Sequence, residues 1–111
     1  MMRWWQRRWL EFKEWAWPYR SLLVIAGDGL ASSPPPRDLV LLTEDGEPWS
    51  VVMMCPCGCG QRVELPLLQE ASPRWNLQVD KLKRPTLHPS VWLRDGCRSH
   101  YFIRSGKVVW V

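Results

Sequence analysis

Residues 49–60 read Trp-Ser-Val-Val-Met-Met-Cys-Pro-Cys-Gly-Cys-Gly, an apolar run that leads directly into three closely spaced cysteines. The fourth cysteine of the 111-residue chain begins the sequence Cys97-Arg98-Ser99-His100. Thiolates and an imidazole grouped in this way are ligands that zinc and iron–sulfur clusters use in proteins. The sequence therefore predicts a small domain built around a metal, in which the apolar run is a strand that presents the first ligands.

A disulfide framework is the main alternative, because an even number of cysteines in a small secreted protein commonly forms bridges. Cysteines one residue apart cannot pair without heavy backbone strain, so at most one of Cys55, Cys57 and Cys59 could bridge to Cys97. The apolar run at residues 22–26 ends at Gly27-Asp28 and is too short for a usual signal peptide. We therefore favour a metal site over disulfides or free buried thiols.

The length and net charge of the chain indicate a single small domain without the features of a nucleic-acid-binding or membrane-spanning protein. A chain of 111 residues corresponds to one domain whose hydrophobic core alone is marginal, so a metal would add stability. The net charge is +4, and the Lys and Arg residues are scattered along the chain, which gives no argument for nucleic acid binding. No stretch approaches the roughly 18 apolar residues of a membrane span. We expect a soluble, cytoplasmic protein.

Two short loops offer candidate metal ligands. A tetrahedral Zn²⁺ needs four donors, and the spacing favours Cys55, Cys57, Cys97 and His100, with Cys59 able to replace either early cysteine. A Cys-x-Cys loop followed by Cys-x-x-His also resembles the Rieske loop pair, which carries a [2Fe–2S] cluster. Position 57 is a cysteine where the Rieske pattern has histidine, so zinc is favoured and an iron–sulfur cluster is the alternative.

The N-terminal 20 residues hold five of the nine tryptophans, interleaved with basic residues. Trp5, Trp9, Phe12 and Ala16 follow the period of one helical face, and Pro18 ends the helix. The helix at residues 1–20 would dock on the domain or a partner, contact a membrane surface with its Trp and Arg side chains, or form a poorly ordered extension. Residues 21–37, which include Ser32-Ser33-Pro34-Pro35-Pro36, are predicted to be a linker.

The remaining residues, 38–111, have a β pattern throughout. A hairpin is predicted from residues 39–43 and 49–54, further strands at 62–65, 75–79 and 86–92, and a terminal hairpin with a two-residue turn at Ser105-Gly106. The expected fold is mainly β: a small metal-stabilised antiparallel domain, Rieske-like or zinc-ribbon-like, preceded by an amphipathic helix.

The β domain also resembles a family of small bacterial proteins. The resemblance rests on four elements: Cys55 to Gly60, Trp75, the segment Thr86-Leu87-His88-Pro89-Ser90, and Cys97-Arg98-Ser99-His100-Tyr101-Phe102-Ile103-Arg104 with Trp110 after it. It covers about two thirds of the chain and leaves out the Trp-rich start. Members of that family are often encoded beside components of a ubiquitin-like conjugation pathway, which implies protein partners of that kind. The resemblance implies no particular biochemical activity.

Catalytic residues are not evident in the sequence. His88 is the only other histidine, and a histidine beside a proline is usually a structural or surface residue. Neither Ser90 nor Ser99 has a visible Ser-His-Asp setting. We therefore interpret the protein as a zinc-binding module for protein–protein recognition, an accessory of a bacterial ubiquitin-like modification or defence system. The alternative is an iron–sulfur redox protein or a small zinc-dependent enzyme.

Overall fold

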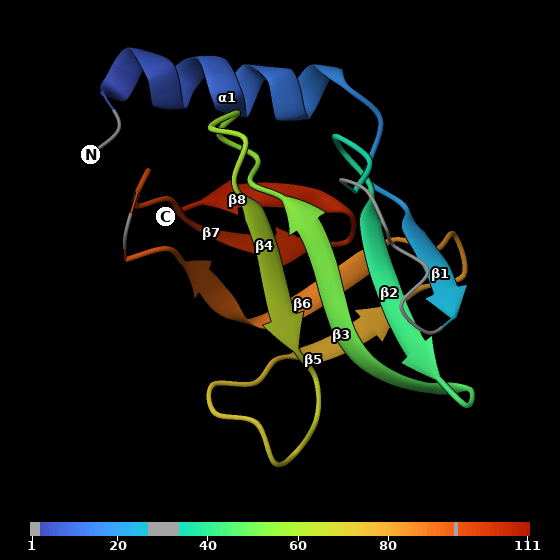
Figure 1. Cartoon of the computed structure of the whole chain (residues 1–111). Helices are drawn as coiled ribbons and strands as arrows, with labels where there is room; N and C mark the ends of the chain where they lie inside the picture. Colours follow the sequence, from blue (N-terminus) through green and yellow to red (C-terminus); the bar gives the residue numbers. More distant parts are fainter. Residues whose placement is uncertain (1–2, 27–33, 95) are drawn as a thin grey trace.

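The computed structural model describes residues 3–26, 34–94 and 96–111. In this described part of the chain, one helix precedes eight strands (Figure 1). Their bounds are α1 Trp4–Ala16, β1 Leu22–Ala26, β2 Leu39–Glu44, β3 Glu47–Met54, β4 Arg62–Pro66, β5 Asn76–Val79, β6 Pro85–Trp92, β7 His100–Arg104 and β8 Lys107–Trp110. The mainly β fold expected from the sequence is confirmed. Within the described residues, no helix has the length and apolar composition needed to cross a membrane.

The strands form two four-stranded sheets, ordered β1-β2-β3-β4 and β5-β6-β7-β8. All pairings are antiparallel except that of β1 with β2. Both predicted hairpins are present, and each turns at a two-residue loop whose residues have positive φ: Asp45-Gly46 between β2 and β3, and Ser105-Gly106 between β7 and β8. Such turns match the right-handed twist of the strands that they join.

Strand β1 was not foreseen from the sequence. Leu22–Ala26 lies in the stretch 21–37 expected to be a linker, yet it forms an edge strand that pairs with β2 from Leu22 opposite Leu39 onward. The Ser21 amide donates to a carboxylate oxygen of Asp38, which helps to set this register. Pro34 is buried, and residues 27–33 of the expected linker lie outside the described residues.

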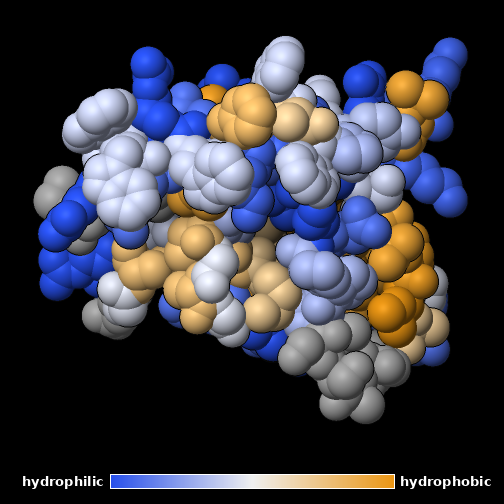
Figure 2. Space-filling model, turned by 90° about the horizontal axis from the view of Figure 1, so that it is seen from above, coloured by the Kyte–Doolittle hydropathy of each residue, from blue (hydrophilic) through white to orange (hydrophobic). Residues whose placement is uncertain are grey.

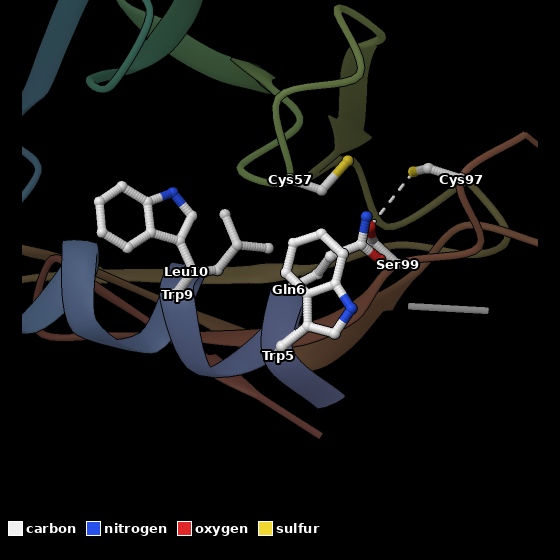
Figure 3. Close-up of a pocket in the computed structure, with 7 residues that line it drawn as sticks. All are labelled: Trp5, Gln6, Trp9, Leu10, Cys57, Cys97 and Ser99. Carbon is white, nitrogen blue, oxygen red and sulfur yellow. Dashed lines mark hydrogen bonds between the residues drawn. The ribbon is translucent and has the colours of Figure 1, made fainter. Parts of the chain in front are cut away.

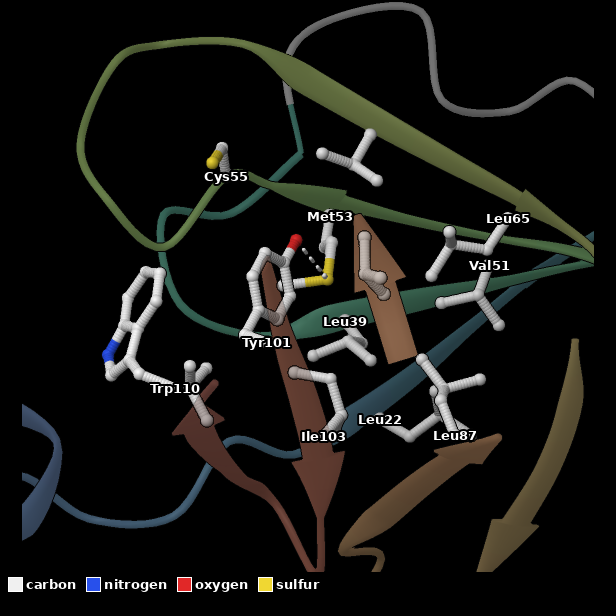
Figure 4. Packing of buried hydrophobic residues seen from close by; sticks show 13 residues of the cluster. Leu22, Leu39, Val51, Met53, Cys55, Leu65, Leu87, Tyr101, Ile103 and Trp110 are labelled. Carbon is white, nitrogen blue, oxygen red and sulfur yellow. Dashed lines mark hydrogen bonds between the residues drawn. The ribbon is translucent and has the colours of Figure 1, made fainter. Parts of the chain in front are cut away.

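The main hydrophobic core lies between the two sheets (Figure 4). Val51, Met53 and Leu65 enter it from the first sheet, while Tyr101 and Ile103 enter it from the second. All are almost completely buried, as alternation along half-buried strands requires. Cys55 lies at the edge of this core, so the first candidate ligand is fixed by the same packing that holds the sheets together.

Helix α1 lies over one end of the sheets and packs mainly against β8 (Figure 1). Its buried anchor is Glu14, which is only 6% exposed and pairs with Arg20 at 2.9 Å. Glu14 also accepts the amide of Val108 in β8. The side chains of the predicted aromatic stripe, Trp5, Trp9 and Phe12, are more than half exposed, so a polar contact rather than this stripe holds the helix on the domain.

Candidate functional site

The first cysteine loop follows β3 and closes back on itself. The Cys55 amide donates to the carbonyl of Gln61, and the Gly58 amide donates to the carbonyl of Cys55. Gly58 and Gly60 both have φ near +85°, a conformation that favours glycine and curls the backbone between the cysteines. The tight loop therefore brings its three thiols to one side.

The fourth cysteine comes from the loop between β6 and β7. The Leu93 amide donates to the carbonyl of Ser99, which closes this loop and carries Cys97 toward the first one. The sulfurs of all four cysteines, Cys55, Cys57, Cys59 and Cys97, lie within 4.8 Å of one another. All four thiols are free. The two loops thus bring together every thiol of the chain in a group that can hold a metal ion.

The spacing of the sulfurs fits one tetrahedral ion. Cys55 Sγ lies 3.4 Å from Cys57 Sγ and 3.6 Å from Cys97 Sγ. Four sulfurs at about 2.3 Å from a zinc ion form a tetrahedron with edges of about 3.8 Å. A two-iron cluster divides its ligands between two metals, which spreads the sulfurs further apart. The donor set therefore suits a single ion, and four sulfurs are typical of zinc or iron.

The protonation of the thiols depends on their surroundings. Burial raises the pKa of the Cys55 thiol far above its ordinary range. Partial burial also acts to raise the pKa of Cys97, but hydrogen bonds from Ser99 and from the neighbouring thiols outweigh it and lower that pKa to about 7. The Ser99 hydroxyl lies 3.2 Å from Cys97 Sγ, and the Gln61 amide donates to Cys59 Sγ. Such hydrogen bonds stabilise thiolates that ligate a metal.

A hollow of about 360 Å³ separates the cysteine group from α1 (Figure 3). Cys57 and Cys97 line one side, and Trp5, Gln6 and Trp9 of the helix line the other. The helix thus lies beside the candidate metal centre.

His100 does not lie in the cysteine group. It is the first residue of β7, and its Nε2 is 2.9 Å from the hydroxyl of Ser90 on β6. Its ring stacks on Trp92, with ring centroids 5.0 Å apart and planes within 13°. Of the five candidate ligands predicted from the sequence, the structure brings the four cysteines together and places the imidazole of His100 beside Ser90 instead.

The contact between Ser90 and His100 depends on an irregularity in β6. The register of β6 against β7 shifts between Leu87 and Val91, so Ser90 lies in the bulged segment. Bulges re-aim side chains and are common beside active sites. The indole of Trp75 donates to the carbonyl of Ser90 at 3.3 Å and holds this segment from the β5 side. A hydroxyl held against an imidazole nitrogen is the arrangement of an activated serine nucleophile.

An open hollow of about 400 Å³ lies beside His100, and Ser90 is not among its lining residues. Arg7, Trp92, Arg98 and His100 are among its lining residues, so the space next to the imidazole is basic and aromatic. Ser99 borders both hollows and separates the two candidate sites.

Sequence reasoning missed the Ser90–His100 pair because the Cys-x-x-His spacing assigned His100 to the metal. The signal that could have found it was present: Trp75, Ser90 and His100 all belong to the elements that carried the family resemblance. These three residues converge on one site, and the four cysteines converge on another. His88 is exposed on β6 opposite Asn76.

Of the comparisons with known proteins, the one with family models gave a match. A family model described as "Bacterial ubiquitination-like system serine protease (BubE)" matches residues 27–111. The matched range contains the four cysteines, Ser90 and His100, and α1 precedes it. No curated protein and no solved structure matches the chain, and nothing supports the weaker likeness to the Rieske loop pair. Because the match spans well over half of the sequence, the chain belongs to the BubE family of the bacterial ubiquitination-like system.

Proposed function

We propose that the protein is a serine peptidase that acts on a protein of the ubiquitination-like system, with Ser90 as nucleophile and His100 as its base. The distance of 2.9 Å between Ser90 Oγ and His100 Nε2 carries this proposal. The description of the family as a serine protease supports the same activity. Free thiols persist in reducing compartments, which supports a cytoplasmic location.

The geometry suits acyl transfer. With its proton on Nδ1, the imidazole accepts the hydrogen bond of the Ser90 hydroxyl through Nε2 and takes that proton as Oγ attacks the substrate carbonyl. The protonated ring then gives the proton to the leaving amine, and water hydrolyses the acyl-serine by the same steps in reverse. Stacking on Trp92 fixes the plane of the imidazole, so Nε2 points at Ser90. Trp92 is therefore a positioning residue.

The cysteine group would bind one Zn²⁺ through Cys55, Cys57, Cys59 and Cys97. Four protein thiolates leave no open position for water, which is typical of a structural rather than a catalytic zinc. The ion would fix the loop that connects β6 to β7, and with it both ends of the Ser–His contact. We therefore assign the metal to stability and the peptide chemistry to Ser90 and His100.

Cleavage of the ubiquitin-like protein of the same system, carrying a C-terminal extension, tests the proposal. Ser90→Ala should lower the rate by about a thousandfold or more while zinc content and melting temperature stay unchanged. Ser72→Ala is the matched control, because Ser72 is exposed and lies outside both sites. A fluorophosphonate should label the wild-type protein at Ser90 only. Full activity of Ser90→Ala would refute the assignment.

A second candidate function is the one that the sequence favoured, a zinc-stabilised module for protein–protein recognition. The exposed Trp92 ring favours it, since aromatic side chains are common anchors of interfaces. This candidate predicts that Ser90→Ala still binds its partner with wild-type affinity and that no variant has hydrolytic activity to lose. An iron–sulfur protein would instead be brown and bleached by dithionite.

A further inference from the structure

The outward surface of α1 is almost entirely aromatic. At 3.6 residues per turn, seven side chains of the helix fall within an arc of about 140°: Trp4, Trp5, Arg8, Trp9, Phe12, Trp15 and Ala16. We call this set the aromatic arc. Every aromatic member is more than half exposed, and Trp4 and Trp15 reach 75% and 79%. Figure 2 looks down on this side of the molecule and shows large ring side chains along it.

The middle of the arc faces away from the domain, while Trp5 and Trp9 at one edge also line the hollow beside Cys57 and Cys97. Leu10 and Glu14, which contact the domain, lie on the opposite side of the helix. Hydrogen bonds from Lys107 to the carbonyls of Glu14 and Trp17 fix the end of the helix, and Arg7 reaches the carbonyl of Trp110. The helix is therefore held in one orientation by its polar side. Within the arc, the ring of Phe12 stacks on that of Trp9 at 5.9 Å and is tilted against that of Trp15 at 6.2 Å.

The charge on this side of the helix is positive. Glu14 is buried against Arg20, and Glu11 is paired with Arg7. Among the described residues, neither Arg3 nor Arg8 forms an ion pair, and Arg8 lies within the arc itself. The aromatic arc thus combines indole rings with the unpaired guanidinium of Arg8, a composition that suits the headgroup region of an anionic bilayer.

We propose that the aromatic arc is an interfacial anchor that binds an anionic phospholipid surface. The 13-residue helix is too short to span a bilayer, and it would lie in the plane of the headgroups with its rings inserted and the β domain on the aqueous side. A lipid surface accounts for the arc better than a protein groove does, because a groove selects a narrow line of anchors whereas the rings cover the full outward width of the helix. The proposal is independent of the peptidase assignment.

Cosedimentation of the full chain with vesicles tests the proposal. The probes are vesicles of phosphatidylglycerol mixed with phosphatidylcholine, and vesicles of phosphatidylcholine alone. The wild-type protein should sediment with the anionic vesicles, more weakly with the neutral ones, and less as salt is added. The triple variant Trp4→Ser, Phe12→Ser, Trp15→Ser should lower the partition coefficient about a hundredfold, because three rings no longer leave water.

Matched variants outside the aromatic arc test whether lipid binding depends on where the substituted residue lies rather than on the loss of any apolar or basic side chain. Leu82→Ser removes an equally exposed apolar side chain from the far turn and should leave the partition coefficient unchanged. Arg8→Glu and Lys81→Glu change the net charge equally, and only Arg8→Glu should weaken anionic binding, about tenfold. All substituted residues are exposed, and circular dichroism checks that each variant stays folded.

Two results would overturn the proposal. One is wild-type protein that stays in the supernatant with both kinds of vesicle. The other is a triple variant that sediments with anionic vesicles as the wild type does. The wild-type protein could instead fail to bind vesicles but self-associate in sedimentation velocity, with the triple variant staying monomeric. The arc would then be a protein interface, and the lipid assignment would be wrong.

Discussion

Ser90 Oγ and His100 Nε2 lie within hydrogen-bond distance across β6 and β7, and the ring of His100 is at the same time stacked on Trp92. His100, three residues after Cys97, thus contacts a serine and lies outside the group of thiols. Ser90 and His100 come from adjacent strands, and the loop that joins those strands carries Cys97. A metal at the cysteine group would therefore stabilise the connection between the two halves of the Ser–His pair.

The variant His100→Gln distinguishes a base from a metal ligand. Glutamine cannot act as a general base at neutral pH, so peptidase activity should fall by about a thousandfold or more. Zinc content, measured by elemental analysis of the purified protein, should stay at one ion per chain because the thiols are untouched. Loss of zinc from His100→Gln would show that the imidazole is a ligand.

Cys59→Ser provides the complementary measurement. Cys59 is exposed, and its sulfur belongs to the group of four. Removal of one thiolate from a tetrahedral site should weaken zinc binding by at least about a hundredfold, measured by competition with a chromogenic chelator. Wild-type affinity in this variant would mean that Cys59 is not a ligand. Cys97→Ser, which removes the only thiol of the second loop, should additionally lower the melting temperature to that of the chelator-treated wild type.

The sequence predicted the parts of the fold that depend on local patterns. Alternation in β4 and β5, the apolar run of β3 and the two-residue turn at Ser105-Gly106 all appear where expected. The spacing predicted that two thiols of the first loop would meet Cys97, and the structure brings all three of them there. The parallel pairing of β1 could not be predicted, because Leu22–Ala26 finds its partner only across the intervening segment.

Two features of the structure could not be predicted from the sequence, for physical reasons. Contact between Ser90 and His100 depends on a bulge in β6. No local sequence pattern predicts where the pairing of two strands changes register. The orientation of α1 was also beyond the sequence, because an apolar stripe normally marks the packed face of a helix. Here the buried Glu14–Arg20 pair decides the orientation, and the stripe is exposed.

Replacing Glu14 should detach α1 from the β domain. Glu14→Ala leaves Arg20 buried without its partner and removes the acceptor of the Val108 amide, so we expect a loss of about 3 kcal/mol in the free energy of unfolding. Glu11→Ala is the matched control, since its ion pair with Arg7 is exposed and contributes less than about 0.5 kcal/mol. Urea denaturation measures both. Equal losses would contradict the role of Glu14 as the anchor of the helix.

Alanine substitutions at Gly106 and Gly46 can be compared to measure the effect of the close approach between the Gly106 turn and the backbone of Arg20. Both have φ near +78° in two-residue hairpin turns, so alanine at either position costs about 1 kcal/mol from backbone strain alone. A Cβ at Gly46 would have no atom within 4 Å, whereas a Cβ at Gly106 would lie 2.6 Å from the carbonyl oxygen of Arg20.

That oxygen belongs to the segment that joins α1 to β1, and the Arg20 amide donates to the Gly106 carbonyl. Gly106→Ala must therefore push this segment away and weaken the buried Glu14–Arg20 pair as well. We expect Gly106→Ala to lower the free energy of unfolding by at least about 2 kcal/mol more than Gly46→Ala does. Chemical denaturation of the two variants side by side measures the difference, and equal stabilities would show that the segment after α1 is not held against the β7–β8 turn.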